Sequence, residues 1–155
     1  FNILNHSNKF KISVENSIVL DLFSGVGSFG LECLSRGAKH VTFVENYSGV
    51  LPILKNNLNN LNISEKYEVI EEDLMSNFPI KKIRQKFNII FLDPPYKEKK
   101  LSNIIDNIFQ AKILNKNGVI VVHRHKKEND EFSKNFKILD EKKYGISKIL
   151  FGTLN

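Results

Sequence analysis

Short apolar runs alternate with segments of helical hydrophobic spacing along most of this chain, and this alternation restricts the fold more than any other feature of the sequence. Such an order is typical of a parallel sheet whose strands are connected by helices. Strands are predicted over residues 17–22, 40–45, 67–70, 87–92 and 118–122. Helices are predicted over residues 29–36 and 47–61 and around Ile104, Ile105 and Ile108. We therefore expect a doubly wound α/β fold with helices on both faces of the sheet.

The alternation of strands and helices ends after residue 122. Residues 136–139 and 146–151 have the pattern of two further strands, joined around residues 142–145. This pattern predicts a closing antiparallel hairpin. No linker-like stretch or internal repeat interrupts the 155 residues, which are enough to bury a core. We expect a single domain over residues 1–155.

The net charge of +6, from 23 basic and 17 acidic residues, suits a polyanionic partner such as a nucleic acid. Lys, Asn and Ile share A/T-rich codons, so genomic bias explains the excess of lysine equally well. No apolar run approaches the roughly 20 residues that cross a bilayer. Cys33 is the only cysteine, and a chain without an internal disulfide fits a reducing compartment. We expect a cytoplasmic protein without a membrane span.

A glycine-rich segment, Gly25-Val-Gly27-Ser-Phe-Gly30, follows the first predicted strand and opens a helix. Glu45 comes 20 residues after Gly25, at the end of the second strand. In this arrangement the glycines let the backbone approach a ligand closely, and the acidic side chain accepts hydrogen bonds from ribose hydroxyls. Alone, the segment fits a dinucleotide equally well, and a chance cluster of turn glycines is a further alternative.

Two acidic residues refine the choice of ligand. Asp21 lies on the first strand, four residues before Gly25, where its carboxylate would repel a pyrophosphate and attract a cationic methionine moiety. This favours S-adenosylmethionine over a dinucleotide. Asp73 follows the third strand, where it can accept a hydrogen bond from an adenine amino group. A solvated acidic turn is an equal interpretation of Asp73.

The sharpest motif is the turn Asp93-Pro94-Pro95-Tyr96, at the end of the most apolar strand. Each proline fixes its own φ angle and restricts the residue before it to extended conformations. The result is a stiff tetrapeptide that presents a carboxylate, backbone carbonyls outside the sheet and an aromatic face. A simple strand-ending turn with a surface tyrosine is the alternative interpretation.

The turn suits methyl transfer to an exocyclic amine. The lone pair of such an amine is delocalised into the base, and two hydrogen-bond acceptors favour its rehybridisation toward a tetrahedral nitrogen. The carboxylate of Asp93 would stabilise the positive charge that develops on this nitrogen. Tyr96 would stack on a base that is single-stranded or flipped out of a helix. The sequence therefore predicts a methyltransferase that acts on an exocyclic amino group of a nucleic-acid base.

Four segments, residues 19–30, 31–38, 41–45 and 92–96, together resemble the RsmD-like family of bacterial methyltransferases, which modify guanine N2 in 16S ribosomal RNA. The resemblance implies a Rossmann-like fold with a seven-stranded mixed sheet whose last strand is antiparallel. It implies cofactor contacts from Asp21, Phe23, Ser24, Gly25, Gly27, Glu45 and Asp73. It implies a catalytic turn formed by Asp93, Pro94, Pro95 and Tyr96.

The chain departs from the family pattern in two places. The family usually carries a basic N-terminal extension, which we expect to be missing here. His123-Arg-His125 stands where an acidic residue is common in relatives. These two histidines are interpreted as a solvated strand end rather than a metal site, because catalytic zinc normally needs three protein ligands. We expect no metal.

Basic residues flank the fourth predicted strand on both sides. The group beside the catalytic turn, Lys97, Lys99 and Lys100, is expected to contact phosphate. The group before the strand is interpreted equally as solvated surface or RNA contact: Lys81, Lys82, Arg84 and Lys86.

Taken together, the resemblance and the motifs predict a monomeric enzyme whose substrate is ribosomal RNA or a partly assembled small subunit, with S-adenosylhomocysteine as a product. Three alternatives stay open. The acceptor could be adenine N6 in DNA or RNA, or a glutamine amide. The same glycine loop could serve a nicotinamide-dependent oxidoreductase. A catalytically silent RNA-binding protein would keep the fold without the reaction.

Overall fold

The computed structural model describes residue 4 and residues 12–95 and 100–155, and it contains every predicted strand and helix. The helices are α2 (Ser28–Ser35), α3 (Leu51–Asn59) and α4 (Leu101–Ala111), with a 3-10 turn, η1 (Ser64–Lys66). The strands are β1 (Ile18–Leu22), β2 (His40–Glu45), β3 (Tyr67–Glu71), β4 (Phe87–Leu92), β5 (Leu114–His125), β6 (Phe136–Tyr144) and β7 (Ser147–Leu154).

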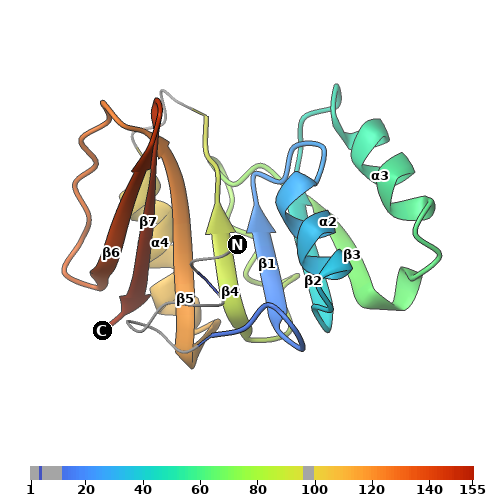
Figure 1. The fold of residues 1–155 in the computed structure, drawn as a ribbon, viewed down its shortest axis with the longest axis horizontal. Coiled ribbons are helices and arrows are strands. Elements are labelled where there is room, and N and C mark those ends of the chain that lie inside the picture. The colour runs from blue at the N-terminus through green and yellow to red at the C-terminus, as the bar shows by residue number, and fades with distance from the viewer. Residues whose placement is uncertain (1–3, 5–11, 96–99) are drawn as a thin grey trace.

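The seven strands form one sheet in the order β3-β2-β1-β4-β5-β7-β6 (Figure 1). The pairs β1–β2, β1–β4, β2–β3 and β4–β5 are parallel. Strand β7 is inserted between β5 and β6 and runs antiparallel to both. The expected mixed sheet with an antiparallel last strand is therefore confirmed, as is the closing hairpin.

Helices cover both faces of the sheet, as expected. On one face, Cys33 of α2 and Leu54 of α3 pack with Phe43 of β2. On the other face, Ile104 and Ile108 of α4 pack with the remaining sheet residues of that side. Successive side chains of a strand point to opposite faces, so each apolar strand contributes to both clusters. In Figure 1, α4 lies behind the sheet and α2 in front of it.

Strand β5 is longer than the sequence predicts, because it starts at Leu114 rather than at Gly118. The register against β4 shifts between Phe87 and Ile89, so that Phe87 pairs with Leu114 and Ile89 with Val119. The polar residues in this first part of β5 concealed the strand from the sequence pattern.

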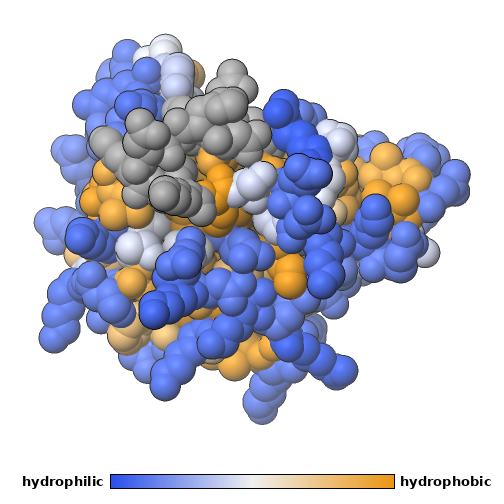
Figure 2. Space-filling view, turned by 60° about the horizontal axis from the view of Figure 1, so that its bottom comes forward, coloured by the Kyte–Doolittle hydropathy of each residue, from blue (hydrophilic) through white to orange (hydrophobic). Residues whose placement is uncertain are grey.

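The face of the molecule drawn in Figure 2 is mostly hydrophilic over the described residues. Figure 2, which brings the lower side of Figure 1 forward, shows hydrophilic side chains over most of the visible face and apolar side chains in smaller areas between them. Among the described helices, none is long and apolar enough to cross a membrane.

The parallel strands bring the glycine segment and the proline turn together. Leu22 pairs with Leu92, so the residues that follow β1 and β4 leave the sheet side by side. The amide of Asp93 lies 3.4 Å from the carbonyl of Leu22, to which it donates. The order of the sheet reverses between β1 and β4, and α/β sheets bind ligands at such a reversal, beyond the carboxyl ends of the strands.

Candidate active site

Three glycines of the segment after β1 occupy positions that favour glycine. Gly25 and Gly27 adopt positive φ angles of 56° and 89°, which only glycine reaches without strain. A Cβ atom on Gly25 would meet nothing within 4 Å, so the backbone there borders open space. A Cβ atom on Gly30 would lie 2.3 Å from Phe43 Cε1. Glycine at position 30 therefore lets α2 pack directly on β2.

Asp21 is a buried carboxylate on β1, only 1% exposed. Its Oδ2 accepts a hydrogen bond from the amide of Gly30, at 2.9 Å. Burial raises the pKa of Asp21 to about 7, the hydrogen bond from Gly30 opposes this shift, and the charges of Asp93 and Glu45 add to it. A cation beside Asp21 would restore the ionised form, since opposite charges attract strongly where water is excluded.

Asp21, Gly25 and Asp93 line one cavity of about 310 Å³. The full lining consists of Asp21, Phe23, Ser24, Gly25, Val26, Ser28, Phe29, Phe91 and Asp93. The structure thus brings together four of the predicted cofactor residues and the predicted catalytic carboxylate. Had Gly25 and Asp93 lain on opposite faces of the molecule, the predicted chemistry would have been impossible.

Two phenylalanines in this lining were missed in the sequence. The rings of Phe29 and Phe91 stack with centroids 3.9 Å apart and planes inclined by 10°. Phe91 lies on β4, two positions before Asp93, and this spacing could have shown that both side chains point to the same face. No comparable signal marks Phe29.

Glu45, at the end of β2, holds the glycine loop from the side. Its Oε2 accepts a hydrogen bond from the amide of Gly25 at 2.8 Å, and its Oε1 accepts from the amides of Asn46 and Tyr47 at 2.8 and 2.9 Å. Ser24 adds a second tie, because its hydroxyl donates to the carbonyl of Asp21 at 2.6 Å. Neither Glu45 nor Gly27 lines the cavity.

Asp73 lies in the turn after β3. Its Oδ1 accepts from the amide of Met75 at 2.9 Å and its Oδ2 from the hydroxyl of Ser76 at 2.7 Å. These hydrogen bonds, first that of Ser76 and then that of Met75, lower the pKa of Asp73. The residue does not line the cavity shared by Gly25 and Asp93. Its contact with an adenine therefore stays a prediction.

The carboxylate of Asp93 is about half exposed, and its Oδ1 lies 2.8 Å from Nδ1 of His123. Because a carboxylate only accepts, the imidazole N–H is the donor in this hydrogen bond. The interpretation of His123 as a solvated strand end was incomplete, since its ring contacts the predicted catalytic residue. The contact follows from the register that pairs Leu92 with Val122, because it places the next residues, Asp93 and His123, side by side.

The rest of the proline turn is described only in part. Pro94 is buried and Pro95 exposed. Tyr96 lies outside the described residues, so its stacking role stays a prediction. In the described part of the chain, no group of three or more His, Cys, Asp or Glu side chains could hold a metal ion.

The basic residues near β4 are exposed where they are described. Lys81, Arg84 and Lys86 have exposed side chains, and Lys82 forms an ion pair with Glu72 at 2.5 Å. Lys100 is exposed, whereas Lys97 and Lys99 lie outside the described residues. Phosphate contact by either group stays a prediction.

Comparison with known proteins gives consistent matches. The family model described as "Conserved hypothetical protein 95" matches residues 1–153. Ribosomal RNA small subunit methyltransferase D of Haemophilus influenzae is 35% identical over 134 residues, covering 86% of this chain and 69% of that protein. The protein of the same name from Buchnera aphidicola is 35% identical over 133 residues, covering 83% and 66%. A solved structure from Haemophilus influenzae is 34% identical, with a TM-score of 0.77 and coverage of 92% and 89%.

Proposed function

Because this chain belongs to the RsmD family, whose model spans residues 1–153, we propose that it transfers a methyl group to the exocyclic N2 of a guanine in small-subunit ribosomal RNA. S-adenosylmethionine-dependent methylation of ribosomal RNA follows from the family. Guanine N2 as the acceptor is the finer part of the proposal. The observation that most supports methyl transfer at this site is the cavity lined by both Gly25 and Asp93.

The residues of this cavity fit S-adenosylmethionine. The molecule carries a sulfonium and an ammonium group, and Asp21 offers a buried carboxylate to a cation. Gly25 leaves open space for a close approach to the backbone. When bound, the cofactor supplies an electrophilic methyl group. The residues that would hold it are Asp21, Phe23, Ser24, Gly25, Gly27, Glu45 and, at the adenine, Asp73.

The proline turn would activate the acceptor amine. His123 holds Oδ1 of Asp93, and Oδ2 of the same carboxylate can accept a hydrogen bond from one amine N–H. The carbonyl of Pro94 would accept the second N–H. Together these acceptors favour a tetrahedral nitrogen, and the charge of Asp93 stabilises the positive charge that develops there. The proton then leaves to Asp93 or to water.

Positioning of the amine against the methyl group supplies the rest of the rate acceleration. Holding the amine in line with the methyl group replaces a bimolecular encounter by a nearly unimolecular one. A base inside a helix cannot reach the cavity, so the guanine must be unpaired or flipped out, with Tyr96 as the proposed stacking surface. We propose ribosomal RNA, free or in a partly assembled small subunit, as the substrate of a monomer.

Adenine N6 is the nearest alternative, since its exocyclic amine requires the same two acceptors. No contact among the described residues favours adenine over guanine. A nicotinamide dinucleotide fits less well, because its pyrophosphate would approach the buried carboxylate of Asp21.

The test is transfer of a labelled methyl group from S-adenosylmethionine to small ribosomal subunits, free 16S ribosomal RNA, DNA and protein, followed by nucleoside analysis. We expect label in N2-methylguanosine from ribosomal RNA. Asp93→Ala should abolish transfer while cofactor binding persists, and Glu141→Ala, on an exposed position of β6, serves as the control. Label in N6-methyladenosine, or full turnover by Asp93→Ala, would contradict the proposal.

A further inference from the structure

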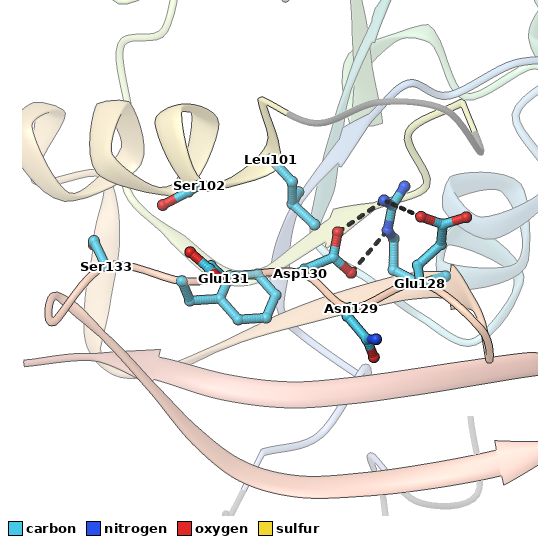
Figure 3. Close-up of a pocket in the computed structure, with 9 residues that line it drawn as sticks. Leu101, Ser102, Glu128, Asn129, Asp130, Glu131 and Ser133 are labelled. Atoms are coloured by element: carbon cyan, nitrogen blue, oxygen red, sulfur yellow. Dashed lines mark hydrogen bonds and ion pairs between the residues drawn. The ribbon is translucent and has the colours of Figure 1, made fainter.

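Arg124 is a buried arginine next to His123 at the end of β5, with a side chain only 2% exposed. Its Nε and Nη2 donate to the two carboxylate oxygens of Asp130, at 3.0 and 2.7 Å. The carboxylate of Glu128 lies 3.8 Å from Nη2. Figure 3 shows Asp130 and Glu128 reaching the same guanidinium from the loop that follows β5. A charge at this depth requires such partners, because burying it alone is costly.

The same guanidinium also reaches the catalytic turn. Nη1 of Arg124 donates a hydrogen bond to the carbonyl of Pro95, at 3.3 Å. Two nitrogens therefore hold the loop after β5, and the third holds the turn after β4. Arginine suits this task because its planar fork presents several donors in fixed directions, which the single ammonium of lysine does not.

We propose that Arg124 is a positioning residue that fixes the backbone of the proline turn, so that Asp93 and the Pro94 carbonyl face the acceptor amine. This inference rests on the proposed function. The turn is then held at both ends: at Asp93 by the carbonyl of Leu22 and by His123, and at Pro95 by Arg124. Because proline rings fix φ, few backbone angles between these anchors remain to be set.

The anchor itself is secured by its surroundings. Asp130 is only 9% exposed, and the loop that carries it is tied to two other elements. Lys148 of β7 donates to the carbonyl of Glu128, and Ser133 donates to Asp106 of α4 at 2.5 Å. The loop after β5 thus connects the proline turn, through Arg124, to strand β7 and helix α4.

Hydrogen bonds and an ion pair hold the buried guanidinium in place. Arg124 borders a cavity of about 620 Å³ that lies between the loop and the start of α4, where Leu101 and Ser102 form the other wall (Figure 3). A side chain beside open space has room to move when its partners are removed. Loss of the Arg124 contacts should therefore release the turn rather than leave it fixed by neighbouring atoms.

The test compares the wild-type protein with the double variant Arg124→Met/Asp130→Leu. Changing Arg124 alone would leave Asp130 buried without its partner and could unfold the protein, whereas apolar replacement of a whole buried pair is often tolerated. The control is Arg36→Met, in the exposed pair of Arg36 with Glu32. The measurements are kcat and KM with small ribosomal subunits, the Kd for S-adenosylmethionine, and hydrogen exchange of the Asp93 amide by NMR.

We expect kcat of the double variant to fall by one to two orders of magnitude, since a misplacement of about 1 Å can cost on the order of 100-fold. The Kd for S-adenosylmethionine should stay as in the wild type, and the Asp93 amide should exchange faster. The Arg36 variant should match the wild type in every measurement.

Three results would overturn the inference. The first is wild-type kcat in the folded double variant. The second is an unchanged exchange rate of the Asp93 amide. The third is a parallel loss of cofactor affinity and kcat, which would indicate a general structural role. If the wild type itself transfers no methyl group, the proposed function fails, and the exchange rate of Asp93 still decides the role of Arg124.

Discussion

At the scale of single residues, Asp21 combines burial with a position in the proposed cofactor cavity. Its pKa is raised to about 7, chiefly by burial. A bound cation favours the ionised carboxylate, so binding near this pH should release a proton. We expect the affinity for S-adenosylmethionine to increase from pH 6 to pH 8. Calorimetry in buffers of different ionisation enthalpy measures both quantities, and a pH-independent affinity without proton release would contradict the assignment.

The same carboxylate should affect stability. Its pKa is about 3.8 when exposed and about 7 in the fold, so the folded state binds more protons between these values. The free energy of unfolding should therefore fall as pH rises from about 4 to about 7. Asp21→Asn removes the buried charge and can still accept from Gly30. At pH 8 it should raise the free energy of unfolding by at most about 4 kcal/mol, at about 1.4 kcal/mol per pKa unit.

Thermal unfolding at pH 4 and pH 8 tests this expectation. The Tm of Asp21→Asn should exceed that of the wild type at pH 8 and approach it at pH 4. An equal difference at both pH values would show that burial does not control this carboxylate. The variant should also bind S-adenosylmethionine more weakly, because the neutral amide no longer attracts a cation.

His123 should orient the carboxylate of Asp93. In His123→Asn, the side-chain amide nitrogen lies near the former position of Nδ1 and can still donate, whereas His123→Leu removes the donor. We expect the leucine variant to lose roughly tenfold in kcat, equivalent to about 1.4 kcal/mol, and the asparagine variant to lose less. Steady-state methyl transfer measures the difference. Equal kcat values for both variants would remove His123 from the mechanism.

At the scale of elements, the contact between α2 and β2 fixes the glycine loop. An alanine Cβ at position 30 would lie 2.3 Å from Phe43 and 2.9 Å from Val41. Gly30→Ala should therefore push α2 off the sheet and lower the free energy of unfolding by about 1–3 kcal/mol. Denaturant unfolding measures this, with Ser35→Ala at the exposed end of α2 as the control. A midpoint equal to that of the wild type would show that the helix shifts at no cost.

The bounds of the strands and helices show which parts of the fold can be predicted from the sequence. The strands over residues 40–45 and 87–92 were predicted with their observed bounds, because each is an apolar run with clear ends. The start of β5 was missed because polar residues fill it. The predicted helix over residues 47–61 is shorter in the structure, at Leu51–Asn59, since residues 48–50 form a turn before it.

The residues of the candidate site likewise include some that the sequence predicts and some that only the structure reveals. Asp21, Gly25 and Asp93 lie in local motifs whose chemistry can be predicted from neighbouring residues. The contacts of His123 with Asp93 and of Arg124 with Pro95 join residues about 30 positions apart along the chain. They arise only from the register between β4 and β5, which hydrophobic spacing does not determine. The sequence therefore predicted the motifs, and the structure added the residues that hold them.

At the scale of the whole molecule, strand order turns two distant motifs into one site. Neighbouring strands β1 and β4 carry the glycine loop and the proline turn to the same edge of the sheet. Strand β5, on the other side of β4, brings His123 and Arg124 to that turn. The fold thus places a cation-binding carboxylate and an amine-binding turn around one cavity.

The location of the bound product is the most direct measurement of this arrangement. A crystal structure with S-adenosylhomocysteine should place its sulfur in the cavity lined by Gly25 and Asp93, with the amino acid part near Asp21. Density for the ligand elsewhere on the molecule, or a sulfur separated from Asp93 by the body of the sheet, would contradict the account.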